Sequence, residues 1–475
     1  MLHVFFPMRK SRQWRISLQN KNLKNGRFLI GTLQSKGMLR RTAMNKITRR
    51  DLIKLFGASA LGTGLMGASS LAFASKSAHI VIVGGGVGGA ASAKYMRLLN
   101  ADVRITIVEP EPKYIFCPGS NEVVAGFDTL ETLTVDYNTL KSRYAVNIIQ
   151  DRATEIDYAA KKLKLAKGDV LSYDKLIVSP GPDFKYGAVE GYSKQLAEGN
   201  FPAAWHAGPQ TLVLRDQINA LPQGGTVLIS SPVDPYRCPP APYERASFIA
   251  NKLKDTNPTA KVIILDSKDD FIFHDVYLDF WKKEHGLGTP DARIEWVPKK
   301  AGGHVTKLDT KNRTLTTANG QVHKGDVINI IPPEMAGSFV RMNGLAEGDW
   351  APFNSQDFST KRDKDVYIIG DSAAADPMPK TGYIASNQAK VVTKAIQAEL
   401  TGKEIGTPFI TNNCVAMAAE DWGMTVAETF RYAGNHHPYE ESYVMSDPTD
   451  NPYYRHIRAE VAKNWQRTFR KDIFS

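Results

Sequence analysis

The sequence predicts an α/β protein with two parallel-sheet domains of the dinucleotide-binding type and a C-terminal interface domain. Three observations predict this fold class. An apolar segment at 79–83 runs into a glycine-rich turn, a second strand-and-turn unit opens at 225–230, and a third apolar segment at 365–371 ends in Gly-Asp. Alternating strand, turn and helix units of this kind build Rossmann-like domains. The chain of 475 residues is long enough for three domains.

The order of these segments predicts the domain boundaries. Because the last strand of the first domain comes late in the chain, we expect that domain to be interrupted by the second and completed after it. The predicted parts are a signal region over 1–74, the first part of the first domain over 75–190, the second Rossmann-like domain over 191–324, the return of the first domain over 325–402 and the interface domain over 403–475.

The N-terminal region has the pattern of an export signal. Arg49 and Arg50 precede an uncharged run over 55–74 that ends in Ala-Phe-Ala, as in a cleaved signal peptide. The paired arginines resemble a Tat signal, which implies export to the periplasm. A membrane anchor is the alternative, but four Gly and four Ser or Thr make the run weakly apolar. We therefore expect no integral span after cleavage, with Met44 as a plausible true start that makes 1–43 a misassigned extension.

The formal charge of +11 is concentrated at the N-terminus. Residues 1–54 hold 14 Lys or Arg and one acidic residue, whereas the chain from Ser75 onward holds 46 basic and 48 acidic residues. A nearly neutral remainder lacks the basic surface that nucleic-acid binding requires. His436 and His437 have no further ligand at metal-binding spacing nearby. We therefore expect neither a nucleic-acid partner nor a metal site.

The first glycine-rich turn has the spacing of a dinucleotide fingerprint. Gly84, Gly86 and Gly89 follow the strand at 79–83 and precede a helix-like segment. Glycines at these positions permit a tight turn and let the backbone approach a pyrophosphate, which the helix N-terminus then holds. Glu109 ends the next strand, 25 residues after Gly84, where an acid accepts a hydrogen bond from a ribose hydroxyl.

Two later segments favour FAD over NAD as the nucleotide. The strand and turn at 173–181, ending in Gly181, look like the segment that closes the FAD domain in flavoproteins with two dinucleotide-binding domains. The strand ending in Gly370-Asp371 looks like their late strand, whose Asp binds the ribityl or phosphate region of the flavin. Each segment alone is also typical of a buried strand that ends in a turn.

The second domain lacks the glycine fingerprint of an NAD site. Between its first strand and first helix lies the segment 231–245, which contains four prolines between Pro232 and Pro240 and a fifth at 242. Proline fixes φ and removes an N–H donor, so this turn is a poor cradle for phosphate. The turn holds Cys238 instead. We therefore expect that this domain binds no NAD and that the electrons come from another source.

These segments closely resemble the flavoprotein subunit of flavocytochrome c sulfide dehydrogenase, a glutathione-reductase-like flavoprotein. The likeness runs from about residue 77 to the C-terminus and includes all three cysteines. The segments that carry it are 114–123, 237–247 and 369–383.

The resemblance implies a role for each cysteine. It implies that the sulfur of Cys117 is bonded to the 8-methyl carbon of the flavin, and that Cys238 and Cys414 form a redox-active disulfide beside the ring. The alternative is that all three are buried small apolar side chains, the usual fate of a free cysteine. Two small departures from the family are Ala241, where members often have Gly in the turn that aims Cys238, and Pro118 after Cys117. We expect them to change the chemistry little.

The resemblance also implies the reaction and a partner. Sulfide attacks the disulfide, giving a persulfide and a thiolate, and two electrons pass through FAD to a haem. Glu244 is the candidate for proton handling, with a structural carboxylate paired with Arg245 as the alternative. No C-x-x-C-H motif occurs, so a c-type cytochrome subunit must supply the haem. The rival functions are sulfide:quinone reductase and a flavoprotein that assists or reactivates a sulfur-carrier system.

Overall fold

The computed structural model describes residues 77–432 and 438–475. The predicted signal region over 1–74 lies outside the described residues, and so do His436 and His437. The fold below is that of the described residues, which lie in the unit Ala74–Ser475.

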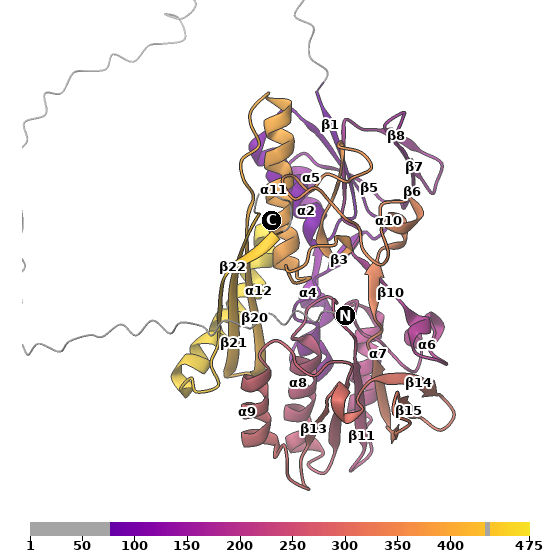
Figure 1. Ribbon diagram of the computed structural model, residues 1–475, viewed down its shortest axis with the longest axis vertical. Coiled ribbons are helices and arrows are strands. Elements are labelled where there is room, and N and C mark those ends of the chain that lie inside the picture. The colour runs from indigo at the N-terminus through magenta and orange to yellow at the C-terminus, as the bar shows by residue number, and fades with distance from the viewer. Residues whose placement is uncertain (1–76, 433–437) are drawn as a thin grey trace, which may run out of the picture. The chain divides into compact units, whose positions relative to one another are not determined.

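The first domain is built on a five-stranded parallel sheet (Figure 1). The strands in spatial order are β19 (Val366–Ile368), β9 (Lys175–Val178), β1 (His79–Val83), β2 (Arg104–Val108) and β5 (Asn147–Ile149). Most of their residues are buried apolar side chains, as expected for strands covered on both faces, and the exposed exceptions Arg104 and Asn147 begin β2 and β5. The late strand β19 pairs with β9, so the return of the chain after the second domain completes this sheet.

Helices and smaller sheets surround this sheet. Helix α2 (Val87–Leu99) follows the glycine turn and packs against α11 (Gly382–Leu400). The remaining elements are β3 (Lys113–Ile115), α3 (Ser120–Ala125), α4 (Leu130–Leu133), β4 (Thr134–Asp136), α5 (Asn138–Ser142), β6 (Ala153–Asp157), β7 (Lys162–Leu165), β8 (Val170–Ser172) and α10 (Ser338–Met342).

The second domain contains a four-stranded parallel sheet. Its strands in spatial order are β13 (Ile294–Val297), β12 (Lys261–Asp266), β11 (Thr226–Ser231) and β17 (Val327–Ile330). The other elements are α6 (Lys194–Glu198), α7 (Pro209–Asn219), α8 (Ala241–Thr256), α9 (His274–His285), β14 (Val305–Asp309), β15 (Thr314–Thr317) and β16 (Val322–Lys324). The two domains are joined where β10 (Pro182–Phe184) and β18 (Glu334–Ala336) pair as an antiparallel ribbon.

The C-terminal domain is an antiparallel sheet covered by one long helix. The sheet consists of β20 (Phe409–Ala419), β21 (Trp422–Tyr432) and β22 (Pro438–Met445), and α12 (Pro452–Phe474) packs on β20 and β21. In Figure 1 these yellow elements run alongside both other domains. The sheet contributes Ala416, Met424 and Val426 to the core of the second domain, whereas the end of α12 contributes Phe469 and Phe474 to the core of the first.

The packing of the C-terminal domain against both other domains positions Cys238 and Cys414. Cys414 of β20 and Cys238 of the loop before α8 both pack against the core of the second domain. The two residues are 176 positions apart in the chain. Only the docking of the C-terminal sheet onto the second domain brings them to the same place.

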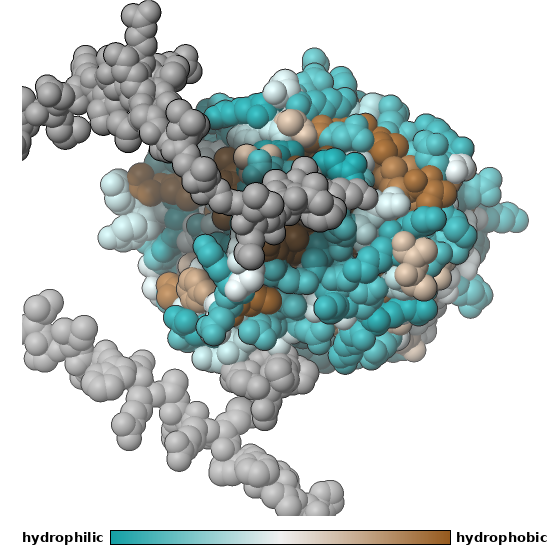
Figure 2. Space-filling view, turned by 90° about the horizontal axis from the view of Figure 1, so that it is seen from above, coloured by the Kyte–Doolittle hydropathy of each residue, from teal (hydrophilic) through white to brown (hydrophobic). Residues whose placement is uncertain are grey.

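Within residues 77–432 and 438–475, no helix is both long and apolar enough to cross a bilayer. On the end of the molecule seen in Figure 2, hydrophobic residues form several patches separated by hydrophilic ones. Such scattered apolar residues are normal on a folded surface.

Candidate functional site

The glycine turn after β1 leaves no room for side chains. A Cβ added at Gly84 lies 2.3 Å from the carbonyl oxygen of Ser179, and one added at Gly89 lies 1.9 Å from that of Gly84. Gly84 also has a φ of +95°, which favours glycine. Gly86 caps α2 without a side-chain hydrogen bond. The N–H groups of the first helical turn are therefore available to a phosphate.

Glu109 closes the nucleotide cradle at the end of β2. Its Oε2 accepts a hydrogen bond from the Gly85 N–H at 2.7 Å, and its Oε1 accepts one from the Glu111 N–H at 2.9 Å. Burial raises the pKa of this carboxyl above its usual value. The sequence predicts that Glu109 binds a ribose hydroxyl. In the structure, the hydrogen bond from Gly85 to Glu109 also holds the glycine-rich turn in shape.

We expect Gly89→Ala to abolish flavin binding, because its Cβ overlaps a backbone oxygen that cannot move without opening the turn. The measurement is the ratio of flavin absorbance to protein absorbance after purification. Gly187→Ala is the matched control, because nothing lies within 4 Å of a Cβ there. Flavin content unchanged by Gly89→Ala contradicts the assignment of the turn.

Three more predicted residues, Gly181, Gly370 and Asp371, follow the adjacent strands β9 and β19. Gly181 follows β9, and its carbonyl oxygen accepts a hydrogen bond from the Ser372 hydroxyl at 2.6 Å. The Gly370 N–H donates to Gln388 Oε1 at 2.7 Å. Burial raises the pKa of Asp371, and the cations Arg237 and Lys380 oppose this rise. Strand β19 therefore delivers Asp371 to the same edge of the sheet as the glycine turn.

The three cysteines are half-buried free thiols. Cys117 follows β3, Cys414 lies in β20, and Cys238 precedes α8 with a left-handed φ of +57°. The Cys238 N–H donates to the Lys380 carbonyl oxygen at 2.8 Å, which holds this strained residue in place.

The other two cysteines lie close enough to Cys238 to affect its pKa. Burial raises the pKa of Cys238 well above its usual value, and the neighbouring Cys414, Glu244 and Cys117 raise it further, whereas Arg237 lowers it. Burial also raises the pKa of Cys414 to about 12. The structure therefore gathers all three predicted cysteines around one site, while the disulfide between Cys238 and Cys414 stays a prediction.

Glu244 lies in the first turn of α8, close enough to Cys238 and Cys414 for its charge to raise their pKa values. Its Oε1 accepts a hydrogen bond from the Met417 N–H at 2.9 Å, and its Oε2 accepts one from the Asn121 amide at 2.8 Å. Burial and the charge of Glu122 raise the pKa of Glu244 to about 8. A carboxyl with this pKa exchanges protons near neutral pH.

The alternative interpretation of Glu244 was a structural carboxylate paired with Arg245, but the hydrogen bonds of Arg245 go to other residues. Its Nε donates to Asn121 Oδ1 at 3.0 Å, so that Asn121 bridges the two side chains. Its other nitrogens donate to the Ala204 carbonyl at 2.7 Å and to Asn329 Oδ1 at 2.8 Å. Arg245 is 1% exposed and has the contacts of a structural residue.

Sequence reasoning missed a second charged group beside the cysteines. The backbone N–H of Arg237 donates to Glu334 Oε2 at 2.9 Å, and the guanidinium of Arg237 donates to the Trp205 carbonyl. Burial raises the pKa of Glu334 to about 7, and its Oε1 is buried without a hydrogen-bond partner in the structure. Lys380 Nζ lies 3.6 Å from the centre of the Trp350 ring. Arg237 and Lys380 lie within the segments that carry the family resemblance. Glu334 lies outside those segments, so nothing in the sequence pointed to it.

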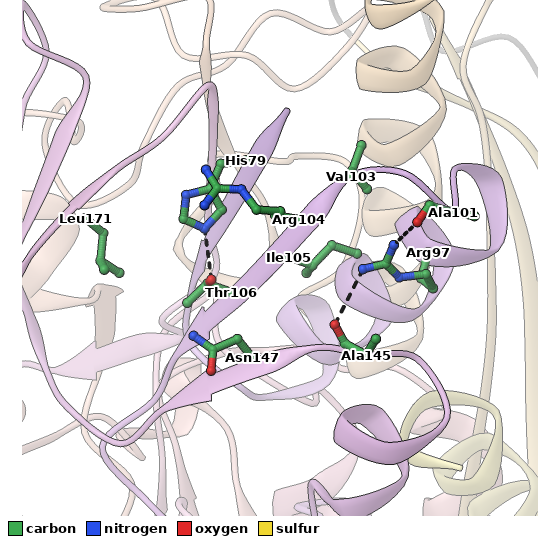
Figure 3. A pocket seen from close by; sticks show the side chains of 10 residues that line it. All are labelled: His79, Arg97, Ala101, Val103, Arg104, Ile105, Thr106, Ala145, Asn147 and Leu171. Carbon is green, nitrogen blue, oxygen red and sulfur yellow. Dashed lines mark hydrogen bonds between the residues drawn. The ribbon is translucent and has the colours of Figure 1, made fainter. Parts of the chain in front are cut away.

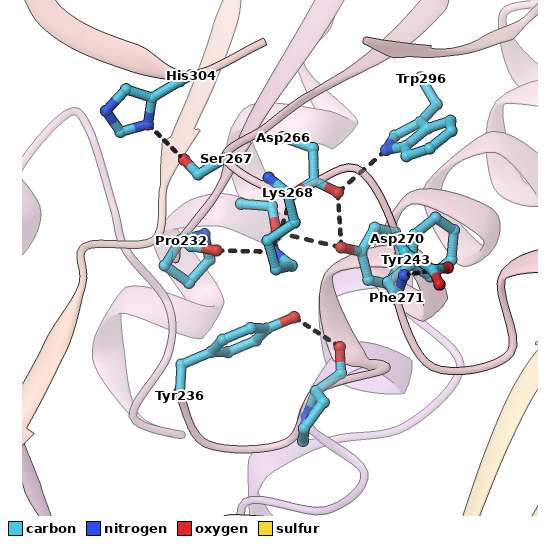
Figure 4. A network of polar contacts seen from close by, with 12 residues as sticks. Pro232, Tyr236, Tyr243, Asp266, Ser267, Lys268, Asp270, Phe271, Trp296 and His304 are labelled. Carbon is cyan, nitrogen blue, oxygen red and sulfur yellow. Dashed lines mark hydrogen bonds and ion pairs between the residues drawn. The ribbon is translucent and has the colours of Figure 1, made fainter. Parts of the chain in front are cut away.

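A network of buried polar contacts lies in the second domain (Figure 4). Lys268 Nζ donates to Ser231 Oγ, to the Pro232 carbonyl and to Asp266 Oδ1, at 2.7 to 2.8 Å. Asp266 Oδ2 accepts hydrogen bonds from the Tyr243 hydroxyl at 2.6 Å and from the Trp296 indole at 3.0 Å. These groups lie at the carboxyl ends of β11 and β12, where an open α/β sheet binds its ligand.

A cavity of about 560 Å³ lies at the opposite edge of the first sheet. Its lining includes His79, Arg104 and Asn147, the first residues of β1, β2 and β5 (Figure 3). None of the cysteines lines it. In the described part of the chain no group of three His, Cys, Asp or Glu residues is placed to hold a metal.

Comparisons with known proteins agree with this arrangement. Residues 78–202 match the family model of pyridine nucleotide-disulphide oxidoreductases. Residues 211–332 match the central part of the flavoprotein chain of flavocytochrome c sulfide dehydrogenase, and residues 406–474 match the flavin-binding part of the same enzyme. The fold and the glycine cradle define a FAD-binding oxidoreductase with two dinucleotide-binding domains.

Two relatives show to which family of FAD-binding oxidoreductases the chain is similar. The chain is 50% identical over 45 residues to the flavoprotein chain of sulfide dehydrogenase from Chlorobaculum thiosulfatiphilum, a match that spans 94% of that sequence and 10% of this one. It is 25% identical over 377 residues to the sulfide-quinone reductase of Aquifex aeolicus, which covers 74% of this chain and 83% of that protein. The protein belongs to the family of flavocytochrome c sulfide dehydrogenase flavoprotein chains, as its sequence predicted.

A solved structure supports the fold. The sulfide:quinone oxidoreductase of Aquifex aeolicus superposes with a TM-score of 0.65 at 19% identity, covering 84% of this chain and 92% of that one. The predicted α/β fold class is confirmed.

Proposed function

We propose that this chain oxidises sulfide at a disulfide between Cys238 and Cys414 and passes the electrons through FAD, bound covalently at Cys117, to a c-type cytochrome subunit. The observation that carries the proposal is the gathering of these cysteines with Glu244 in one half-buried site. The family, named for sulfide dehydrogenation, supports the choice of substrate.

The sulfur chemistry follows from thiol–disulfide exchange. The sulfur of hydrosulfide bonds to one cysteine sulfur, and the bond between the two cysteine sulfurs breaks. The products are a persulfide on one cysteine and a thiolate on the other. The sulfide sulfur is oxidised and the disulfide is reduced, so the electrons balance within this step.

Glu244 supplies the proton that the released sulfur needs. Because burial raises the pKa of Cys414 to about 12, a thiolate formed there takes up a proton. Glu244, with a pKa of about 8, carries that proton at pH 7. The carboxylate left behind then accepts the proton of the persulfide, which restores Glu244.

The residues present fit FAD. The glycine cradle, the uncapped start of α2, Glu109 and the Gly370-Asp371 turn all lie at one edge of the first sheet. When bound, FAD accepts two electrons together and can return them one at a time. Cys117 lies near both Cys238 and Arg237, close enough for its charge to affect their pKa values, which supports a flavin link beside the disulfide.

We propose that the second domain binds no NAD. A proline-rich turn stands where a glycine fingerprint would hold the pyrophosphate, and the carboxyl ends of β11 and β12 are occupied by the buried ion pair of Lys268 and Asp266. We also propose that the paired arginines before residue 55 direct export to the periplasm, where a disulfide persists.

The electron acceptor distinguishes the proposed function from the two rival functions. Purified protein should reduce a soluble c-type cytochrome in the presence of sulfide and should leave decylubiquinone oxidised. Rapid reduction of the quinone instead favours the function named for the Aquifex aeolicus relative. Absence of turnover with both acceptors, together with stimulation of a reconstituted sulfur-oxidising system, favours assistance to a sulfur carrier.

A further inference from the structure

A two-residue segment before α11 contacts the backbone elements that carry both Cys238 and Cys414. Lys380 and Thr381 are the last two residues before that helix, which begins at Gly382. Both residues are buried.

The Lys380 end of the segment holds the turn that contains Cys238. The backbone carbonyl of Lys380 accepts the hydrogen bond from the Cys238 N–H at 2.8 Å. The stretch 235–240 contains three prolines, which lack an N–H, so this bond uses one of the few backbone donors of the turn. The Lys380 ammonium donates to the carbonyls of Asp371 and Ala373 at 2.9 and 2.8 Å, which fixes the segment beside the predicted flavin residue Asp371.

The Thr381 end of the segment holds the strand that contains Cys414. The Thr381 hydroxyl donates to Asn412 Oδ1 at 3.0 Å, and this hydrogen bond is buried. Asn412 and Cys414 are two positions apart in β20, so their side chains lie on the same face of the sheet. The Thr381 hydroxyl also accepts a hydrogen bond from the Ile384 N–H at 3.1 Å and thereby caps α11.

These contacts join three parts of the chain that are far apart in sequence. Cys238 belongs to the second domain and Cys414 to the C-terminal sheet, whereas Lys380 and Thr381 precede α11 of the first domain. Because the two anchoring residues are adjacent, both cysteine backbones are held against the same short segment. Groups held in a fixed relative position react with each other as if at high concentration, which favours a bond between them.

We propose that Thr381, through its hydrogen bond to Asn412, is a positioning residue that aligns the Cys414 strand with the turn of Cys238. Thr381 acts through Asn412 and the backbone of β20. The alignment favours the disulfide over two separate thiols, so its loss raises the reduction potential of the pair. The inference rests on the proposed function, which supplies the disulfide.

The test measures the reduction potential of the cysteine pair in the full-length, flavin-loaded protein. The protein is equilibrated without oxygen in dithiothreitol buffers of graded potential and alkylated, and mass spectrometry gives the reduced fraction of Cys238 and Cys414. In Thr381→Val the equilibrium constant for disulfide formation should fall ~10-fold, as expected for the loss of one buried hydrogen bond. That change corresponds to a rise of about 30 mV in potential. Thr381→Ser keeps the hydroxyl and should retain the wild-type potential.

Two further variants separate the bond to Asn412 from other effects of the hydroxyl. Thr393→Val is the matched control, because Thr393 is a buried residue of the same helix whose hydroxyl donates to the Lys390 carbonyl within that helix. It should leave the potential unchanged. Asn412→Ala removes the proposed bond and leaves the cap of α11 intact. Combining it with Thr381→Val should shift the potential no further than the larger single shift, and additive shifts overturn the proposal.

Alkylation of the reduced protein distinguishes failure of this inference from failure of the proposed function. A wild-type pair that stays reduced in every buffer refutes the disulfide of the proposed function. Thr381→Val should even then speed the reaction of Cys238 or Cys414 with iodoacetamide ~10-fold, because the released turn or strand opens more often. Wild-type alkylation rates and an unshifted potential in Thr381→Val overturn the positioning role of Thr381.

Discussion

Replacing either Cys238 or Cys414 by Ser should lower the rate of flavin reduction by sulfide by ~10³-fold or more, as loss of an essential nucleophile or leaving group does. A serine hydroxyl cannot form the disulfide that sulfide attacks, and the remaining cysteine alone has no partner to release. Both side chains are half-buried and pack against the same core, so the exchange of sulfur for oxygen changes little of the packing. Stopped-flow measurement of flavin bleaching after mixing with sulfide gives the rate.

Cys117→Ser is the matched control, because it removes the third thiol of the same site and leaves the pair intact. It should release the flavin into acid extracts, whereas wild type should retain it on the tryptic peptide that contains Cys117. Flavin absorbance and circular dichroism check that each variant is folded. Undiminished reduction in both pair variants refutes the disulfide route, and a fully extractable flavin in wild type refutes the covalent link.

Lys268→Met should lower the free energy of unfolding by ~3–5 kcal/mol, the usual cost of removing one partner from a buried ion pair. Asp266 is fully buried and Lys268 is 9% exposed. Without the lysine, the Asp266 carboxylate keeps its hydrogen bonds from Tyr243 and Trp296 but loses the opposing charge. Urea unfolding followed by circular dichroism measures the change.

The double variant Asp266→Asn with Lys268→Met should recover most of that loss, because no uncompensated charge stays buried. The amide of Asn can still accept the hydrogen bonds of Tyr243 and Trp296. An additive loss in the double variant contradicts the ion-pair interpretation.

Adding NADH should leave the flavin of wild type oxidised, and rapid bleaching contradicts the proposal that this domain binds no NAD.

Local sequence patterns predicted the parts of the site that depend on local geometry. Gly84 and Gly89 appear as a spacing because the turn they form spans only a few residues, and the structure shows the close approaches that require them. The prolines before α8 likewise predicted a loop without the flexibility of a phosphate cradle. The family resemblance then drew attention to Cys117, Cys238 and Cys414.

The electrostatic part of the site did not follow from the sequence. Glu244 was a candidate six residues after Cys238, but burial and the charge of Glu122 in α3 raise its pKa to about 8. Hydrogen bonds from Asn121 in α3 and Met417 in β20 oppose this rise. Glu334 escaped notice because a carboxylate at the start of a strand has no local signature. Its burial and its contact with Arg237 arise where the chain crosses between the domains.

The sequence by itself determined the fold class, the nucleotide cradle and the absence of a glycine fingerprint in the second domain, because these depend on residues close together in the chain. Only the tertiary structure decided which carboxyls lie near the sulfurs and which cation pairs with Asp266 in the second domain. Desolvation and charge coupling depend on distances in space, and those are set by the docking of the C-terminal sheet and α12 onto both other domains.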